Sequence, residues 1–314
     1  MTGLFVIAGP TASGKSALAL RLAEAVGGMI INADSMQLYR DLRILTARPT
    51  PEDEARVPHR LYGVLDAGEP ASVGRWLELA GIAIGEARAE RRPAIVVGGT
   101  GLYLHALLHG LAPVPEIAAA IRSAARARFS ALGAPAFHAE LAVRDPAMAA
   151  RLRPGDRQRL IRAYEVIVGT GRSLAAWQAA PPVRIELPAP RIGAALMPPR
   201  AALHERIERR LHAMIERGAL AELEELRRRS LDPDLPLMKA VAVPELLAHL
   251  EGGIALAAAL DRAIVQTRRY AKRQMTFLRH QLPELRFLEA FGDAVDLPVP
   301  RPAPGLVDRS AFGA

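Results

Sequence analysis

Short apolar runs alternate with amphipathic segments along much of the chain. The runs are Leu4–Ala8, Met29–Ala33, Ala94–Val97 and, with a weaker pattern, Arg191–Met197 and Arg286–Leu288. Between the first two runs, Leu18, Leu22 and Val26 recur at helical spacing. Continuous apolar strands alternating with helices are typical of βαβ units. The pattern therefore predicts an α/β fold with a mostly parallel sheet.

The middle of the chain has helical periodicity only. Expected helices cover residues 117–132, 134–142, 147–151 and 156–168. Proline-rich segments at 113–115 and 181–190 flank them, as expected for hinges. We therefore expect an all-helical insertion, residues 113–185, within a core formed by residues 1–112 and 186–314. Two long amphipathic helices are expected in the second part of that core, over residues 200–229 and about 255–282.

Composition excludes several kinds of protein. The chain has no cysteine, which rules out disulfides, thiolate zinc sites, iron–sulfur clusters and cysteine nucleophiles. No uninterrupted apolar run approaches the ~20 residues that span a bilayer, and the first residues lack the pattern of a signal peptide. We expect a cytoplasmic protein without a membrane partner, acting as a monomer.

The charge is strongly basic. Lysine and arginine number 41 against 33 acidic residues, a net charge of +8, and the only lysines are Lys15, Lys239 and Lys272. An excess of this size favours a polyanionic partner such as nucleic acid. A codon bias that enriches arginine and alanine explains the same composition, so the charge alone does not decide the partner.

A phosphate-binding loop follows the first apolar run. The sequence Gly9-Pro10-Thr11-Ala12-Ser13-Gly14-Lys15-Ser16 fits G-x-x-x-x-G-K-[ST], between an expected strand and an expected helix. In such a loop, typical of ATP-binding and other nucleotide-binding proteins, backbone N–H groups surround phosphate oxygens. Lys15 neutralises the outer phosphate, and Ser16 can hold Mg²⁺. The loop predicts a P-loop NTPase-like core without saying which phosphate it binds.

One acidic residue lies where it could act beside this loop. An ATPase or GTPase adds a strand that ends in a Mg²⁺-binding Asp. The third apolar run ends instead in Gly98-Gly99-Thr100, whereas the second ends at Asp34. Asp34 could be a Mg²⁺ ligand, a general base, or the cap of a following helix.

Two clusters of basic residues lie outside the loop. They are Arg151, Arg153, Arg157, Arg159 and Arg162 in the insertion, and Arg268, Arg269, Lys272, Arg273 and Arg279 in the last long helix. Each cluster alone fits a solvated helix face, but both together with an anion-binding loop favour a polyanion. Arg206 and Arg210 are four residues apart and share a helix face, which either is solvated or reaches an anion.

Longer motifs are more specific than the loop. They are residues 9–16, Ala-Asp-Ser-Met-Gln-Leu-Tyr at 33–39, Gly-Gly-Thr-Gly-Leu-Tyr at 98–103, Asp-Pro at 145–146, Asp-Arg-Gln-Arg at 156–159 with Arg-Ala-Tyr-Glu-Val at 162–166, Leu-His-x-Arg-Ile-Glu-x-Arg at 203–210, and Thr-Arg-Arg-Tyr-Ala-Lys-Arg-Gln at 267–274. On these motifs nearly the whole chain resembles the tRNA dimethylallyltransferases, also called tRNA isopentenyltransferases.

The resemblance implies a reaction and its residues. A dimethylallyl group passes from dimethylallyl diphosphate to N6 of the adenosine 3′-adjacent to the anticodon in tRNA. By match, the loop from Thr11 to Ser16 binds the diphosphate with Mg²⁺, Arg210 stabilises the leaving group, and Asp34 is the general base. A diphosphate in the loop explains the missing Mg²⁺-binding strand.

The resemblance also implies where the anticodon stem-loop of tRNA is met. The matching residues are Asp34, Ser35, Met36, Gln37, Thr100, Arg122, Gln158, Arg159, Leu160, Ile161 and Arg162. Two positions depart from the family's pattern: Ala242 stands in the segment where many members have Gly-Tyr, and Phe277 replaces a familiar Trp. Both departures concern tRNA contacts more than the reaction.

Two other functions are compatible with the loop. A nucleoside or nucleotide kinase of the P-loop class would use Asp34 as base and ATP in the loop. A nucleic-acid-binding NTPase switch would carry out no covalent chemistry on its partner. Ligand binding separates these alternatives, since a prenyltransferase prefers dimethylallyl diphosphate to ATP.

Overall fold

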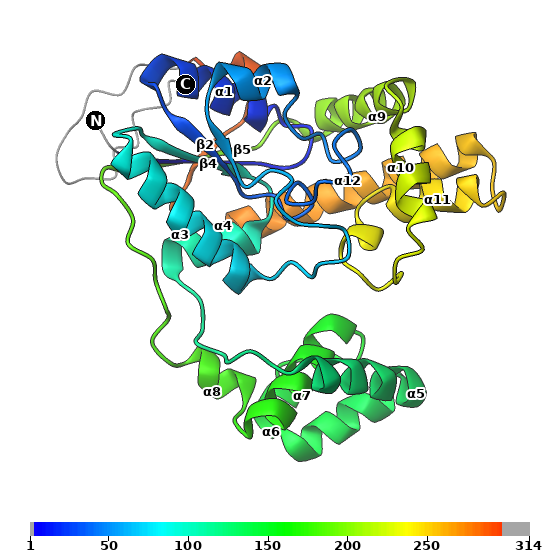
Figure 1. Ribbon diagram of the computed structural model, residues 1–314. Helices are drawn as coiled ribbons and strands as arrows, with labels where there is room; N and C mark the ends of the chain where they lie inside the picture. Colours follow the sequence, from blue (N-terminus) through cyan, green and yellow to red (C-terminus); the bar gives the residue numbers. More distant parts are fainter. Residues whose placement is uncertain (1–2, 297–314) are drawn as a thin grey trace. The chain divides into compact units, whose positions relative to one another are not determined.

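The chain folds into two compact units. A computed structural model describes residues 3–296 and divides the chain into Met1–Leu108 with Ile185–Ala314, here called the core unit, and His109–Arg184, here called the helical unit (Figure 1). The prolines predicted an insertion over residues 113–185, whereas the helical unit of the structure runs from His109 to Arg184. The expected core also includes residues 297–314, which lie outside the described residues.

Six strands of the core unit form one parallel sheet. They are β1 (Leu4–Ala8), β2 (Met29–Asn32), β3 (His59–Arg60), β4 (Ala94–Gly98), β5 (Arg191–Leu196) and β6 (Arg286–Leu288). Their order is β3-β2-β4-β1-β5-β6, and every described pairing is parallel. The predicted α/β class is confirmed, as are the five predicted strands. The two residues of β3 are too few to show a period in the sequence.

The core unit also contains helices, some of which cover the two faces of the sheet (Figure 1). They are α1 (Lys15–Val26), α2 (Pro51–Arg56), α3 (Val73–Ala89), α4 (Gly101–His109), α9 (Arg200–Glu216), α10 (Ala219–Arg228), α11 (Val243–Leu250) and α12 (Leu256–Gln281), with short 3₁₀ turns η1 (Leu237–Lys239) and η2 (Gly292–Ala294). Phe5 and Ile7 of β1 pack with Leu18 and Leu22 of α1 in one buried cluster. Figure 1 shows α3 and α4 on the other side of the strands.

The prediction of a single helix over residues 200–229 is wrong, because this segment forms two helices, α9 and α10. The chain breaks between α9 and α10, where Gly218 has a φ of 98°, in the left-handed region that glycine favours. The break lets α10 pack against both α9 and α11, burying Leu223 and Leu226. The apolar period continues through both helices, so the sequence pattern does not reveal the turn.

The helical unit has a core of its own. Its helices are α5 (Ala119–Arg144), α6 (Pro146–Ala149), α7 (Arg157–Thr170) and α8 (Leu174–Gln178). The two helices expected at 117–132 and 134–142 are joined in α5 across a kink at Gly133, where φ is 72° and ψ is 168°. The rings of Phe129 and Phe137 meet 5.0 Å apart within an apolar cluster that includes Leu141 and Leu160.

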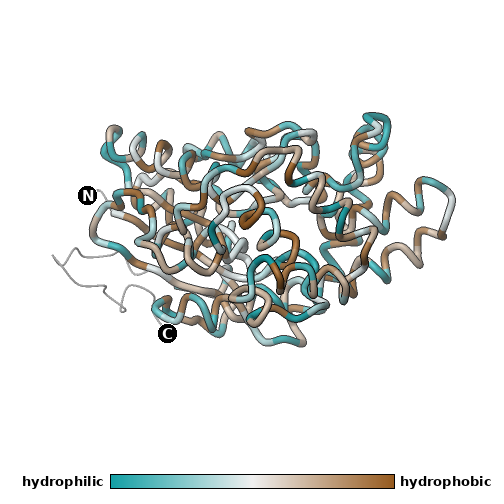
Figure 2. The backbone as a smooth tube through the Cα atoms, turned by 90° about the horizontal axis from the view of Figure 1, so that it is seen from below, coloured by the Kyte–Doolittle hydropathy of each residue, from teal (hydrophilic) through white to brown (hydrophobic). Residues whose placement is uncertain are grey.

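The helices are amphipathic rather than apolar throughout. Figure 2 shows hydrophobic and hydrophilic residues alternating along them, as expected when one face packs and the other meets water. Among residues 3–296, no helix is both long enough and apolar enough to cross a bilayer.

Candidate active site

Three loops meet at the carboxyl edge of the sheet. β4 lies between β1 and β2, and the pairs Ala8–Gly98 and Asn32–Val97 end the two ladders. In a parallel sheet the segments after neighbouring strands emerge side by side at the same edge. The phosphate loop (residues 9–14), residues 33–37 and residues 99–100 are therefore neighbours.

The phosphate loop has the conformation that anion binding requires. Gly14 has a φ of 84°, and α1 begins at the next residue, so the positive end of a helix of 12 residues faces the loop. Ser13 is fully buried, and its N–H donates to the carbonyl of Pro10 over 3.2 Å. The Oγ of Ser13 is buried without a hydrogen-bond partner. A phosphate oxygen would satisfy such an atom.

Two cations, the buried Lys15 and the half-buried Arg210, lie at this loop. Lys15 is 9% exposed, and burial lowers its pKa to about 8, although the nearby charge of Asp34 acts in the opposite direction. Burial also lowers the pKa of Arg210 to about 10, again opposed by Asp34. Arg210 donates to the Oγ1 of Thr11, while its Nε is buried without a partner. A multiply charged anion would pair both cations and the unpartnered donors.

Arg206 does not share this role. Its guanidinium pairs with Asp293 at 2.8 Å and lies 4.7 Å from the ring centroid of Phe291. Of the two arginines on one face of α9, only Arg210 reaches the phosphate loop.

Asp34 is held by residues on either side of it. Its N–H donates to the Oδ1 of Asn32 over 2.8 Å, and its own Oδ1 accepts from the N–H of Met36 over 3.0 Å. A turn, not a helix, follows at residues 35–38, so Asp34 caps a turn and not the helix that one hypothesis required. The charge of Asp34 acts on Lys15 and on Arg210. The carboxylate is therefore close to the anion site.

Thr100 joins two of the loops. Its Oγ1 accepts from the N–H of Ser35 over 2.9 Å and lies 3.3 Å from the Oγ of the same residue. The Tyr270 hydroxyl also hydrogen-bonds to Thr100. The pKa of this hydroxyl is raised, mainly by burial and to a smaller extent by the negative charge of Asp34. Ser35, Thr100 and Tyr270 thus surround the approach to Asp34.

The segment after Asp34 is fixed by side chains. Gln37 is 8% exposed and donates to the carbonyls of Thr46 and Ala47 over 2.8 and 3.0 Å, so its amide holds the loop. Met36 is half-buried. On the other side of the loop, the carboxylate of Glu222 accepts the backbone N–H groups of residues 43, 44 and 45.

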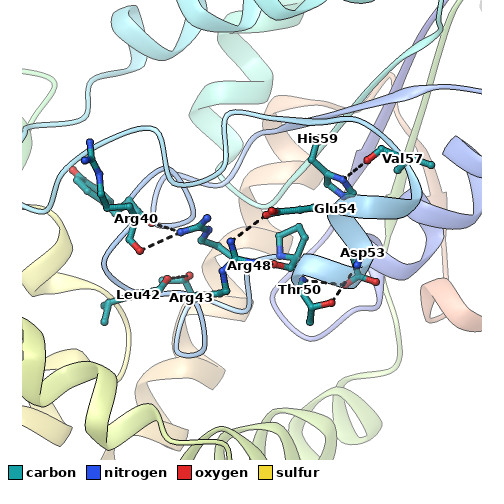
Figure 3. Close-up of polar contacts among 12 residues, drawn as sticks. Arg40, Leu42, Arg43, Arg48, Thr50, Asp53, Glu54, Val57 and His59 are labelled. Atoms are coloured by element: carbon teal, nitrogen blue, oxygen red, sulfur yellow. Dashed lines mark hydrogen bonds and ion pairs between the residues drawn. The ribbon is translucent and has the colours of Figure 1, made fainter.

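Figure 3 shows the rest of this segment. Arg48 donates to the carbonyls of Tyr39 and Arg40, each over 3.2 Å, and Arg43 pairs with Glu54 at 3.4 Å. Thr50 and Asp53 form a reciprocal capping box at the start of α2. Side-chain contacts therefore hold the loop that follows Asp34 at several points along its length.

The remaining predicted tRNA-binding residues belong to the helical unit. Gln158 and Arg159 are exposed, and Arg122 is half-buried. Arg162 pairs with Glu165 at 3.4 Å, and Arg159 with Asp156 at 3.4 Å. These are surface groups with side chains that a ligand can reach.

Leu160 and Ile161 differ from their neighbours on α7. Both side chains are buried in the apolar cluster of the helical unit. They shape α7, whereas the side chains of Gln158 and Arg159 face solvent.

Mg²⁺ fits this site as a companion of a phosphate ligand. Ser16 is exposed in the first turn of α1 and offers one oxygen, with Asp34 as the acidic group near the loop. Residues 3–296 contain no group of three or more His, Asp or Glu side chains that could hold a metal. Mg²⁺ commonly takes one or two protein oxygens together with phosphate oxygens and water.

Four residues were missing from the site predicted from sequence. Asn32 positions Asp34, Glu222 holds the following loop, Tyr270 contacts Thr100, and Gln274 joins the phosphate loop to Gly99. Tyr270 and Gln274 lie in a motif that carried the resemblance, but no local pattern gave them a role. Their partners are far away in sequence.

Comparisons with known proteins identify a family. A family model described as IPP transferase matches residues 37–281, and one described as isopentenyl transferase matches residues 2–67. A curated tRNA dimethylallyltransferase of Rhodospirillum rubrum is 58% identical over 285 residues, 91% of this chain and 87% of that protein. One of Methylocella silvestris is 57% identical over 280 residues, 88% and 92% of the two chains.

Solved structures give the same result. The full-length tRNA isopentenylpyrophosphate transferase of Bacillus halodurans is 33% identical with a TM-score of 0.65, covering 92% of this chain and 90% of its own. A eukaryotic dimethylallyltransferase described as acting on tRNA is 25% identical with a TM-score of 0.73, covering 92% and 74%. The chain therefore belongs to the tRNA isopentenyltransferase (IPP transferase) family.

Proposed function

We propose that this protein transfers a dimethylallyl group from dimethylallyl diphosphate to N6 of the adenosine 3′-adjacent to the anticodon in tRNA. The observation that carries the proposal is the position of the Asp34 carboxylate within electrostatic reach of both cations at the phosphate loop, Lys15 and Arg210. A base beside a diphosphate site is what this substitution needs. The names of the relatives support a dimethylallyl group as the group transferred and tRNA as its acceptor.

The reaction is a substitution at an allylic carbon. A bond forms between N6 of adenine and C1 of the dimethylallyl group, while the bond between C1 and the diphosphate oxygen breaks. The electron pair of that bond leaves with the diphosphate, and the N6 proton passes to Asp34. Adenine N6 is a weak nucleophile because its lone pair is delocalised into the ring, so base and electrophile must be held together.

The phosphate loop stabilises the leaving group. Its backbone N–H groups, Lys15 and Arg210 face the charge that grows on the diphosphate as the C–O bond breaks. Mg²⁺, held by Ser16 together with phosphate oxygens, would neutralise part of the same charge when bound. Thr100 and Ser35 would hold the adenine edge near Asp34.

The tRNA would be recognised through its anticodon stem-loop. A base in a stacked loop cannot reach an enclosed site, so the target adenosine must leave the stack. The exposed Gln158 and Arg159, together with Arg122 and Arg162, offer donors for phosphates and unstacked bases. One chain carries all the named groups, so we propose a monomeric enzyme.

The test supplies both donors side by side. Purified protein with Mg²⁺ and unmodified tRNA bearing adenosine after the anticodon receives either dimethylallyl diphosphate or ATP. We expect N6-dimethylallyl adenosine, detected by mass spectrometry of digested tRNA, and release of one diphosphate per product with the prenyl donor only. Consumption of ATP with unmodified tRNA under both conditions would replace this proposal with the kinase or NTPase alternative.

A further inference from the structure

Gln274 connects two loops of the site with one side chain. It lies on α12 and is 5% exposed. Its Oε1 accepts the N–H of Thr11 over 2.8 Å, and its Nε2 donates to the carbonyl of Gly99 over 2.8 Å. A backbone N–H requires an acceptor and a carbonyl a donor, so the two partners determine the orientation of the amide.

The contact leaves no space for adjustment. A Cβ added to Gly99 would lie 2.2 Å from the Nε2 of Gln274. The ladder between β1 and β4 ends at the Ala8–Gly98 pair, one residue before Gly99 and three residues before Thr11. Gln274 thus continues the connection between the two strands beyond the last backbone pairing, and without it the half-buried N–H of Thr11 and the buried carbonyl of Gly99 lose this partner.

The two loops that it joins carry different halves of the reaction. Thr11 belongs to the phosphate loop and accepts from Arg210. Gly99 precedes Thr100, whose Oγ1 accepts from the N–H of Ser35, the residue after Asp34. The Oε1 of Gln274 therefore contacts the loop proposed to bind the leaving group, and its Nε2 contacts the residue before Thr100, which bonds to the segment of the proposed base.

From this arrangement we infer that Gln274 is a positioning residue that sets the separation between the phosphate loop and residues 99–100, which in turn contact the loop that carries Asp34. This inference rests on the proposed function. Because its Oε1 and its Nε2 each bond a backbone group, we assign Gln274 to holding the two loops and not to contacting substrate. A displacement of about 1 Å between reacting groups can reduce a rate about 10²-fold. The effect should fall on the chemical step, because each loop can still bind its own ligand.

The experiment compares variants that remove or shorten the connection. Gln274→Met preserves length and loses both hydrogen bonds, and Gln274→Asn keeps the amide but shortens its reach. Thr267→Val is the matched control, since Thr267 is buried on the same helix and donates only to the carbonyl of Ala263 within it. Each protein is measured for single-turnover transfer at saturating substrates, separate affinities for inorganic pyrophosphate and tRNA, and deuterium exchange of peptides containing Thr11 and Gly99.

We expect both Gln274 variants to slow single-turnover transfer by about 10²-fold while changing either affinity less than threefold. The Thr11 peptide should exchange faster, and Thr267→Val should match the wild type in every measurement except melting temperature. Unchanged exchange, or a normal transfer rate with faster exchange, would overturn the inference, as would weaker binding without a slower chemical step. If the wild type transfers no prenyl group, the proposed function fails, whereas the exchange data still decide whether Gln274 holds the two loops.

Discussion

Asn32, Asp34 and Met36 form a local arrangement that fixes one carboxylate. Asn32 is fully buried, and its Nδ2 donates to the carbonyls of Asp34 and Leu61 over 2.9 and 3.0 Å, while its Oδ1 accepts from the N–H of Asp34. Only one oxygen of the Asp34 carboxylate is engaged by Met36. We assign the other oxygen to the proton of adenine N6.

Asp34→Asn tests this assignment. The amide has nearly the same shape and can still accept from Met36, but it cannot take a proton, so we expect turnover to fall ~10²–10⁴-fold. The affinities for tRNA and pyrophosphate should change little. Single-turnover transfer and equilibrium binding measure the two effects separately. Wild-type turnover would show that Asp34 only stabilises its turn.

Lys15 should make the affinity of the site for pyrophosphate depend on pH. Its pKa is lowered to about 8, mainly by burial, so the anion-binding charge is present below that pH and is lost above it. Arg210, with a pKa of about 10, remains charged through this range. We expect the affinity for pyrophosphate to fall as the pH rises through about 8.

Calorimetric titration of pyrophosphate at several pH values measures this effect. In Lys15→Met the affinity should be weaker and should lack the Lys15 transition. The ratio of wild-type to variant affinity removes the ionisation of pyrophosphate itself. A constant ratio across the range would contradict the role of Lys15.

At the scale of elements, the sheet edge brings the loops together by close backbone contact. The Ala33 N–H donates to the carbonyl of Val97 over 2.8 Å, and the Thr100 N–H donates to the carbonyl of Ala33 over 3.2 Å. A Cβ on Gly98 would lie 2.1 Å from the carbonyl oxygen of Ala33. The residue before Asp34 therefore packs directly against the end of β4.

Gly98→Ala should separate these strands. Because the obstructing atom is backbone, we expect a loss of about 1–3 kcal/mol in the free energy of unfolding together with slower transfer. The matched control is Gly85→Ala in α3, where an added Cβ meets nothing within 4 Å. That change should stabilise the protein by about 0.5–1 kcal/mol, since glycine weakens a helix interior. Chemical denaturation of both variants provides the comparison, and equal stabilities would contradict it.

At the scale of the whole molecule, each unit has its own apolar core and its own set of charged groups. The core unit holds the phosphate loop and Asp34, and the helical unit presents the exposed Arg159. Arginines should therefore divide by substrate. Those of the helical unit would act on tRNA, whereas Arg210 would act on the leaving group.

Arg159→Ala should weaken tRNA binding and reduce the slope of log affinity against log salt by about 0.7–0.9. Arg210→Ala should instead slow the chemical step at saturating tRNA, by about 10²–10³-fold, as for the loss of one donor to a developing anion. Arg92→Ala is a control of equal charge change, because Arg92 pairs with Glu90 just before β4, at the opposite edge of the sheet. If Arg210→Ala changes only tRNA affinity, or Arg159→Ala only the chemical step, this division is wrong.

Features of this protein that depend on neighbouring residues could be predicted from the chain alone. Apolar runs predicted the strands, and the glycines with Lys15 predicted the phosphate loop. Short motifs carried the resemblance to the family. Each of these signals lies within a few residues of chain. The tertiary structure alone decided which distant groups meet. Gln274 contacts a loop 263 positions away, Glu222 one 178 positions away, and Arg210 reaches Thr11 across 199. The turn at Gly218 and the burial of Leu160 and Ile161 likewise depend on packing between helices. The spacing of apolar residues shows that a helix has a face to bury, but it does not show which other helix that face packs against.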